Sequence, residues 1–343
     1  MIRAWAPGRV NLIGDHTDHT GGLVLPMAID LGTTVSGRRG GEVVELHSPL
    51  GAEPAVVPLD VVDPAAVAPD WARYVAGVVA EVRPPVGFTG AVDTTLPVGA
   101  GLSSSAALEV AVALALGFAG SPLELAQLGQ RAEQRASGVP CGIMDQLASA
   151  GGLAGHALRI DCTSLEVRPV PLPADLEVVV VDSGQRRELA TSGYADRAAA
   201  CQQAQAAIGP LRDAPLADLA ELEDAVVRRR ARHVITENAR VDELADALGA
   251  GDRASIADAM AASHQSLRHD FEVSTPVLDH LVARLASVEG VIGARLTGAG
   301  FGGCVVALVE RHSALPDDLV VRRVSPSGGA KLLDDQTTSS PTS

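Results

Sequence analysis

The stretch PVGAGLSSSAA, residues 97–107, lies directly before the apolar run ALEVAVALALGF. That run consists of strong helix formers, so we expect a helix to follow the serines. A glycine-rich turn lets the backbone approach a ligand closely, and the start of a helix offers free N–H groups and the positive end of its dipole. A simple tight turn could use the same residues, but the combination is typical of a phosphate-binding loop.

The lysine content decides which kind of phosphate site can be built. The chain has one lysine, Lys331, near its C-terminus. A P-loop requires Gly-Lys-Ser/Thr, and a protein kinase requires a lysine on its third strand. Both classes are therefore excluded. If nucleotide phosphates bind at 97–107, then backbone amides, serine hydroxyls and a metal ion must hold them.

The composition limits the class of protein and its partners. A length of 343 residues suggests roughly two domains, and a formal net charge of −15 disfavours nucleic acid as a partner. Cys141, Cys162, Cys201 and Cys304 form no CxxC pair, which argues against a zinc site and a disulfide framework. The N-terminus meets a charge and a proline too early for a signal peptide, and Glu109 interrupts the longest apolar run. We therefore expect a cytoplasmic protein without a membrane partner.

A second helix is predicted over residues 122–137. Ser121 is a good N-cap, Pro122 suits the first turn, and Glu124 follows as in a capping box. Apolar residues then recur at helical spacing, and Gly138 is a suitable end. This helix is expected to carry Glu133.

The rest of the chain suggests two domains and a tail. EVVVVD, Glu177–Asp182, is predicted to be a buried strand that follows a proline-rich stretch. The second half is mostly helical in pattern, and it ends with short strands at 294–296 and 304–309. We therefore predict three parts: an N-terminal domain of residues 1–175, a C-terminal domain of residues 176–334, and a disordered tail of residues 335–343.

Two further blocks carry polar chemistry. GRVNLIGDHTDH, residues 8–19, gathers Arg9 with short acidic side chains and a histidine, a set suited to neighbouring hydroxyl groups, although a polar turn would look similar. CGIMDQLASAGG, residues 141–152, places Asp145 at the start of a short helix. Such an aspartate is usually a cap, but beside a phosphate site it becomes a candidate base or a group that steers an attacking hydroxyl.

A fourth block, TGAGFGGCVVALV at 297–309, contains the pattern G-x-G-x-x-G. The dinucleotide fingerprint must open a helix, whereas a β-branched run follows here. We therefore reject a dinucleotide site and expect a glycine loop that closes over another site.

Taken together, these blocks resemble the GHMP kinase superfamily and, within it, the galactokinase family. The resemblance rests on GRVNLIGDHTDH, PVGAGLSSSAALEVA and RLTGAGFGGCVVAL, and it extends in family order from about Arg3 to Val309. Further matching segments are CGIMDQ, ATSGYADR (190–197), RARHVITEN (230–238) and SLRHDFEVS (266–274).

The resemblance implies a two-domain α+β fold with the active site in the cleft between the domains. The N-terminal domain would have a ribosomal-protein-S5-like βαβ arrangement, and the C-terminal domain would be ferredoxin-like. The implied reaction is ATP-dependent phosphorylation of the anomeric C1 hydroxyl of α-D-galactose, with ATP and Mg²⁺ as cofactors. It also implies a monomer whose partners are small molecules.

The resemblance also implies roles for individual residues. Asp145 matches the catalytic aspartate, and Arg9 matches the arginine that stabilises the transferring charge. Ser105 and Glu133 match the magnesium ligands. The expected sugar contacts are Asp15, His16, Asp18, Gly142 and Tyr194. The residues expected to wrap the ATP phosphates are Gly99, Gly101, Leu102, Ser103, Ser104 and Ser105.

Departures from the family pattern leave the exact sugar open. Asp15 stands where most galactokinases have glutamate, and the loss of ~1 Å of reach falls at the expected C6 end of the sugar. His19 and Thr20 replace an aromatic ring and an amide. The alternatives are therefore a GHMP kinase for another galacto-configured sugar, such as L-arabinose or galacturonate, and a non-catalytic sugar sensor.

Overall fold

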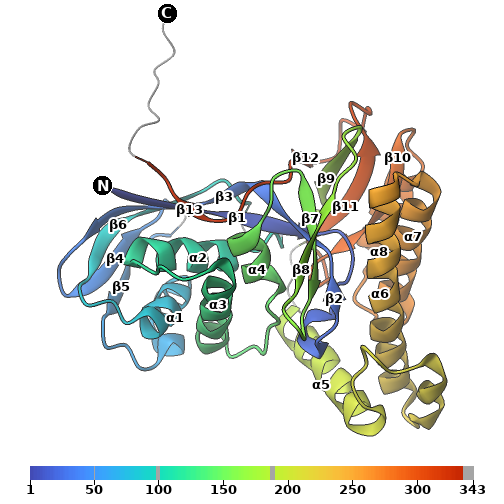
Figure 1. Cartoon of the computed structure of the whole chain (residues 1–343), viewed down its shortest axis with the longest axis horizontal. Helices are drawn as coiled ribbons and strands as arrows, with labels where there is room; N and C mark the ends of the chain where they lie inside the picture. Colours follow the sequence, from blue (N-terminus) through green and yellow to red (C-terminus); the bar gives the residue numbers. More distant parts are fainter. Residues whose placement is uncertain (50, 98–100, 186–189, 335–343) are drawn as a thin grey trace, which may run out of the picture.

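The chain is described here by a computed structural model, which covers residues 1–49, 51–97, 101–185 and 190–334. Its elements form two α+β parts that lie side by side (Figure 1). The predicted disordered tail, 335–343, lies outside the described residues. Among the described residues, no helix combines the length and the apolar character needed to cross a bilayer.

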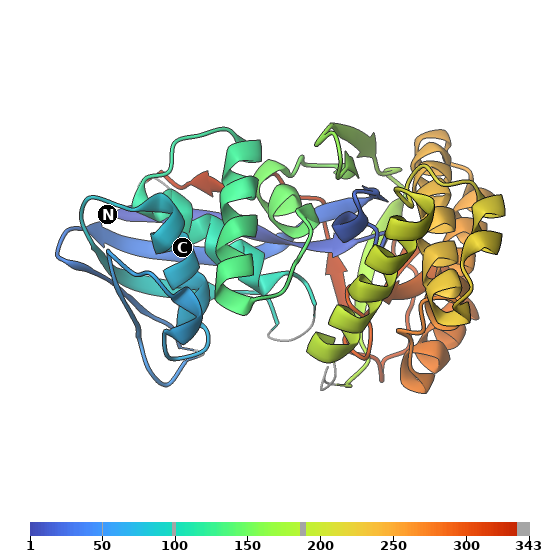
Figure 2. The same cartoon turned by 90° about the horizontal axis from the view of Figure 1, so that it is seen from below.

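The first part is a six-stranded sheet covered on one face by four helices (Figures 1 and 2). The strands, in sheet order, are β13 (Lys331–Leu332), β1 (Ile2–Asn11), β3 (Pro26–Arg39), β6 (Phe88–Thr94), β4 (Val43–His47) and β5 (Ala55–Pro58). The helices are α1 (Ala72–Val82), α2 (Ser104–Leu116), α3 (Pro122–Ser137) and α4 (Met144–Gly151). Only the β4–β6 pair is parallel among the pairs described in this sheet.

The second part combines an antiparallel sheet with a group of long helices (Figure 1). Its strands, in sheet order, are β10 (Val291–Thr297), β11 (Cys304–Glu310), β9 (Leu176–Asp182) and β12 (Val321–Val324). Its helices are α5 (Ala190–Ile208), α6 (Ala225–Ala250), α7 (Arg253–His269) and α8 (Pro276–Ala286). Helices α7 and α8 pack against β10, and α6 packs against α7.

A small three-stranded sheet lies between the two parts. It consists of β2 (Leu23–Val24), β7 (His156–Asp161) and β8 (Val167–Pro171), in that order. Pro169 and Pro171 belong to β8, an edge strand, where a residue without an N–H group is tolerated. The proline-rich stretch before residue 175 is therefore partly a strand. Short 3-10 helices occupy Asp18–Thr20, Pro64–Ala66 and Leu216–Glu221.

Several local predictions are confirmed. Ser121 and Glu124 form the reciprocal capping box of α3, and Gly138 ends this helix in the left-handed conformation. The predicted strand at 177–182 is β9, and the two short C-terminal strands are β10 and β11. Helix α2 begins at Ser104 and is buried around most of its circumference, which accounts for its nearly continuous apolar sequence.

The two parts share a hydrophobic core, and the chain returns to the first sheet at its end. One buried cluster joins Leu12 and Met27 with Val178 and Val306. Strand β13 pairs with β1 more than 320 residues earlier in the chain, with Ala4 opposite Leu332. The division at residue 175 stays a prediction about domain organisation.

Candidate active site

A cleft of about 770 Å³ opens where the polar blocks meet. Its walls come from β1, the loop after β1, helix α3, the starts of α2, α4 and α5, the end of β9, and the glycine loop between β10 and β11. The structure brings together nearly all of the predicted site residues on these walls: Arg9, Asp15, His16, Asp18, Gly101, Ser103, Ser104, Ser105, Glu133, Gly142, Asp145 and Tyr194. Leu102 is buried beneath the loop instead, and Gly99 lies outside the described residues.

Asp145, in the first turn of α4, is held by two side chains from opposite directions. Arg9 donates from Nε to Oδ1 at 2.7 Å, and its Nη2 lies 2.5 Å from the same oxygen. Ser103 donates its hydroxyl to Oδ2 at 2.6 Å. The side chain of Asp145 is still 26% exposed, so the carboxylate is fixed in direction but open to the cleft. This is the arrangement that a steering or proton-accepting group requires.

The structure describes residues 101–105 of the predicted phosphate loop. Gly101 has φ of +78°, a conformation that favours glycine, and its carbonyl accepts a hydrogen bond from Arg9 Nη1 at 2.8 Å. Ser104 and Ser105 then start α2 and line the cleft. The hydroxyl of Ser103 is engaged by Asp145, so this side chain joins the loop to the candidate catalytic group.

Glu133 and Ser105 lie together at one side of the cleft. Ser105 Oγ donates to Glu133 Oε1 at 3.0 Å, although the two residues come from different helices. Burial and the nearby charge of Asp145 raise the pKa of Glu133 to about 7. A hydroxyl and a carboxylate are hard oxygen ligands, and Mg²⁺ in phosphate sites typically takes only one or two carboxylates. These donors therefore fit the magnesium ion that the sequence implies.

A buried hydrogen-bond network that includes Glu133 was not predicted from the sequence. Gln146 donates from Nε2 to Glu133 Oε2 at 2.5 Å and to Glu109 Oε2 at 3.1 Å. Glu109 is fully buried, and this burial raises its pKa well above the usual range. A signal for it was present, because Glu109 is the one charged residue that interrupts the apolar run of α2.

The loop after β1, residues 12–22, carries three of the expected sugar contacts and is called the sugar loop here; Asp15 and His16 in it are more deeply buried than Asp145. Burial, followed by the charge of Asp145, raises the pKa of Asp18 to about 7. A Cβ on Gly142 would lie 2.1 Å from Asp18 Oδ2, so a larger residue would displace that carboxylate.

The His16 ring lies against Tyr194 and Phe271, with ring centroids 5.6 and 4.6 Å away. Burial lowers the pKa of His16 well below its usual range, so the ring is neutral.

Asp15 is almost completely enclosed, with 1% of its surface exposed. Its Oδ2 lies 2.5 Å from Arg295 Nη2, and its Oδ1 accepts the N–H of Gly298 at 2.8 Å. Gly298 belongs to the glycine loop that lines the same cleft, as expected from the fourth sequence block. Arg295 was given no role in the site, although it is the first residue of the matching block RLTGAGFGGCVVAL.

A second cavity of about 770 Å³ adjoins the first one at the phosphate loop. The two cavities share Ser104, Ser105, Glu133, Val139 and Cys141 as lining residues. Trp71 and Tyr74, which precede and begin α1, line the second cavity together with apolar residues such as Leu108. Flat aromatic side chains and apolar walls beside a phosphate site suit the base of a nucleotide.

Comparisons with known proteins agree with this geometry. The galactose-binding signature of galactokinases matches residues 2–39, and the N-terminal and C-terminal domains of GHMP kinases match residues 73–152 and 244–318. A galactokinase from Homo sapiens is 44% identical over 330 residues, covering 90% of this chain and 84% of the relative. A galactokinase from Roseiflexus sp. is 46% identical over 330 residues, covering 90% and 83%.

Solved structures extend the comparison to the fold. The galactokinase of Lactococcus lactis complexed with galactose superposes with a TM-score of 0.88 at 31% identity, covering 97% of this chain and 95% of that one. The mevalonate kinase of Methanococcus jannaschii superposes with a TM-score of 0.70 at 19% identity, covering 95% and 98%. The second likeness concerns the fold alone.

Proposed function

This chain belongs to the galactokinase family of GHMP kinases, and from that premise we infer that the cleft around Asp145 is where it phosphorylates galactose. It is an ATP-dependent sugar kinase. We propose that the acceptor is the anomeric C1 hydroxyl of α-D-galactose and that the product is galactose 1-phosphate.

The observation that carries this proposal is the position of Asp145 between the two binding loops. Arg9 and Ser103 fix its carboxylate where the sugar loop and the phosphate loop meet. Asp145 orients the C1 hydroxyl and takes its proton as the new oxygen–phosphorus bond forms, while the bond from the γ-phosphorus to the β-phosphate oxygen of ATP breaks and ADP leaves. Phosphoryl transfer is governed by positioning and charge stabilisation, and Arg9 places a guanidinium beside the reacting atoms.

The sugar is held by the residues of the loop after β1 and by two segments that face it. Asp15, Asp18 and His16 supply hydrogen-bonding groups, and Tyr194 closes one wall. Gly142 leaves the space that the Asp18 carboxylate occupies. The contacts of Asp15 define the C6 end of the site, so discrimination against L-arabinose and galacturonate depends on this residue.

ATP extends from the first cavity into the second. The backbone from Gly101 to Ser105 and the N-terminus of α2 hold the phosphates, as the dipole of a helix favours. Trp71 and Tyr74 take the adenine. Ser105 and Glu133 would hold Mg²⁺, which neutralises phosphate charge when it is bound.

A turnover measurement tests this function. ADP release with ATP and magnesium should be much faster with D-galactose than with 2-deoxygalactose, talose, L-arabinose, galacturonate, glucose or no sugar. Preference for another sugar would assign the chain to that substrate, and sugar binding without turnover would support a sensor. The expected monomeric state and cytoplasmic location remain predictions from the sequence.

A further inference from the structure

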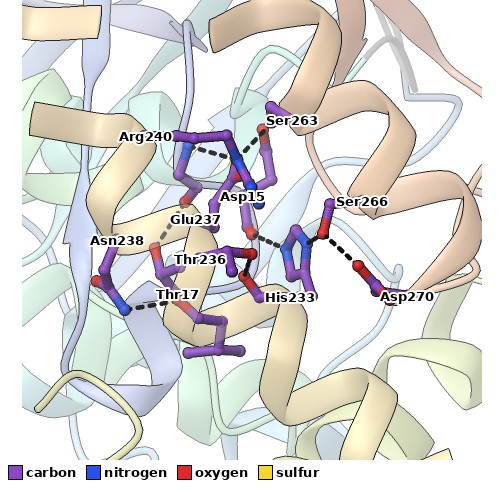
Figure 3. Close-up of polar contacts among 12 residues, drawn as sticks. Asp15, Thr17, His233, Thr236, Glu237, Asn238, Arg240, Ser263, Ser266 and Asp270 are labelled. Atoms are coloured by element: carbon purple, nitrogen blue, oxygen red, sulfur yellow. Dashed lines mark hydrogen bonds and ion pairs between the residues drawn. The ribbon is translucent and has the colours of Figure 1, made fainter. Parts of the chain in front are cut away.

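The sugar loop forms hydrogen bonds with residues that lie more than 200 positions later in the chain (Figure 3). Each of these contacts reaches a backbone group of the loop or of Leu23, the first residue of β2. The pairs are Gly14 N–H to Glu237 Oε1 at 3.1 Å, His233 Nε2 to Asp15 O at 3.1 Å, Leu23 N–H to Asn238 Oδ1 at 2.6 Å, and Arg295 Nη1 to Leu12 O at 3.0 Å. The loop therefore takes its shape from α6 and β10.

The residues that provide this support do not line the cleft. His233, Glu237, Asn238 and Arg295 are absent from both cavity walls described above. Three of them belong to the segment RARHVITEN, which resembles the family but has no role in the proposed reaction. They therefore have no direct contact with the cleft, and the sugar loop is a part of its wall that all four of them touch or adjoin.

Arg295 fixes the direction of the Asp15 carboxylate. It is fully buried, and one Nη2 atom lies 2.5 Å from Asp15 Oδ2 and 3.7 Å from Glu237 Oε1. Because Gly298 N–H occupies the other carboxylate oxygen, Asp15 cannot rotate without breaking a buried contact. The carboxylate therefore presents a defined edge to the sugar.

His233 fixes the backbone of Asp15. A carbonyl can only accept, so Nε2 of His233 carries the proton that bonds to Asp15 O. Burial lowers the pKa of His233, so the ring is neutral, and its Nδ1 lies 3.0 Å from Ser266 Oγ, whose hydroxyl also lies 3.1 Å from Asp270 Oδ2. The ring also lies against Phe271, with the centroids 4.6 Å apart. This contact chain runs from α7 through α6 to the sugar loop (Figure 3).

We propose that Arg295 and His233 are positioning residues that set the affinity for galactose through Asp15, without touching sugar or ATP. The proposal rests on the proposed function, in which Asp15 faces the C6 end of galactose. Loss of either support frees Asp15 and weakens only the interaction with that end of the sugar.

The test compares the variants Arg295→Lys and His233→Phe with the unmodified chain. The affinity for D-galactose, measured by calorimetric titration, should fall about tenfold, the loss expected for one hydrogen bond to a charged group. The affinity for 6-deoxy-D-galactose, which lacks the C6 hydroxyl, and the KM for ATP should change less than about twofold. His233→Gln keeps a donor near Asp15 O and should restore part of the lost affinity.

Arg159→Lys is the matched control, because Arg159 joins β7 to Asp242 of α6 at 2.6 Å without contacting the sugar loop. It should leave the affinities for D-galactose and 6-deoxy-D-galactose and the KM for ATP unchanged. If Arg295→Lys does not fold, Ser266→Ala replaces it, because it removes the hydroxyl that contacts both His233 Nδ1 and Asp270 Oδ2 and leaves His233 itself in place. It should weaken galactose binding about threefold.

The outcomes separate the two proposals. If the unmodified chain does not phosphorylate galactose, the proposed function fails. If it does, and the variants weaken galactose and 6-deoxy-D-galactose equally, or lower kcat with affinity unchanged, the positioning role is wrong.

Discussion

Arg9 and Asp145 form a side-on ion pair that joins the first strand to the start of α4, 136 residues later. Nε and Nη2 of the arginine both face Oδ1, at 2.7 and 2.5 Å, and leave the second carboxylate oxygen to Ser103. The side chain of Arg9 is 7% exposed. The pair therefore carries its charges at the wall of the cleft, where the proposed mechanism places the reacting hydroxyl and the transferring phosphoryl group.

Asp145→Asn should fold and lose most of its turnover. The amide keeps the shape of the side chain but cannot accept the sugar proton, and it removes the charge that faces Arg9. We expect kcat to fall by about 10²–10⁴, the usual contribution of a general base. Asp182→Asn is a control in the same cleft, because Asp182 bonds there to the backbone N–H of Gly184. Turnover of Asp145→Asn close to that of this control would remove Asp145 from the mechanism.

Glu133→Gln should raise the magnesium concentration needed for half-maximal activity by about tenfold, because a neutral amide is a weaker ligand than a carboxylate. The measurement is a magnesium titration at saturating ATP and galactose, accompanied by Mn²⁺ binding followed by electron paramagnetic resonance. Glu124→Gln, on the exposed first turn of the same helix, should behave as the unmodified chain does. Unchanged metal binding in Glu133→Gln would contradict the ligand role.

The pH dependence of kcat/KM for galactose should report the ionisation of Asp18. Its pKa is raised to about 7, so the free protein binds galactose with a protonated Asp18 at low pH and with a carboxylate above pH 7. The carboxylate accepts hydrogen bonds from sugar hydroxyls with both oxygens, so kcat/KM for galactose should rise up to about pH 7 and then level off. Asp18→Asn should lack this inflection. An inflection that persists in this variant would assign it to Glu133, whose pKa is also raised to about 7.

The same pKa shift has a consequence for stability. In the unfolded chain Asp18 loses its proton near pH 3.8, whereas in the folded chain it keeps the proton to about pH 7. The folded state therefore binds more protons between these values, and the contribution of Asp18 to the free energy of unfolding falls as the pH rises through that window. Relative to Asp18→Asn, the unmodified chain should lose stability between about pH 4 and pH 7. Urea denaturation of both proteins at several pH values measures this difference.

Trp71→Ala should raise the KM for ATP about tenfold, because stacking of a base on an aromatic ring is worth about 1–3 kcal/mol. The KM for galactose should stay the same, since Trp71 lines only the second cavity. Trp5→Ala is the control. Trp5 lies on β1 against Lys331, and it lines neither of the two cavities. Equal changes in both KM values would indicate general damage to the fold.

The sequence determined the local parts of this protein. The Ser121 cap, the Gly138 stop and the start of α2 at the serines depend on a few neighbouring residues, so their physical signals are short-range. The loops that carry Asp18 and Asp145 could be identified in the same way, and the family resemblance assigned roles to them. Their meeting in one cleft follows from that resemblance and not from spacing along the chain.

Only the tertiary structure decided which distant groups touch these loops. Arg295 lies 280 residues from Asp15, and Gln146 joins two carboxyl groups from different helices. Ser103 gives its hydroxyl to Asp145, although the sequence suggested a phosphate contact. Such pairs form because the packing of strands and helices brings buried polar atoms together, and a buried polar atom is stabilised when it finds a partner. The identity of that partner depends on the whole fold, so no local pattern records it.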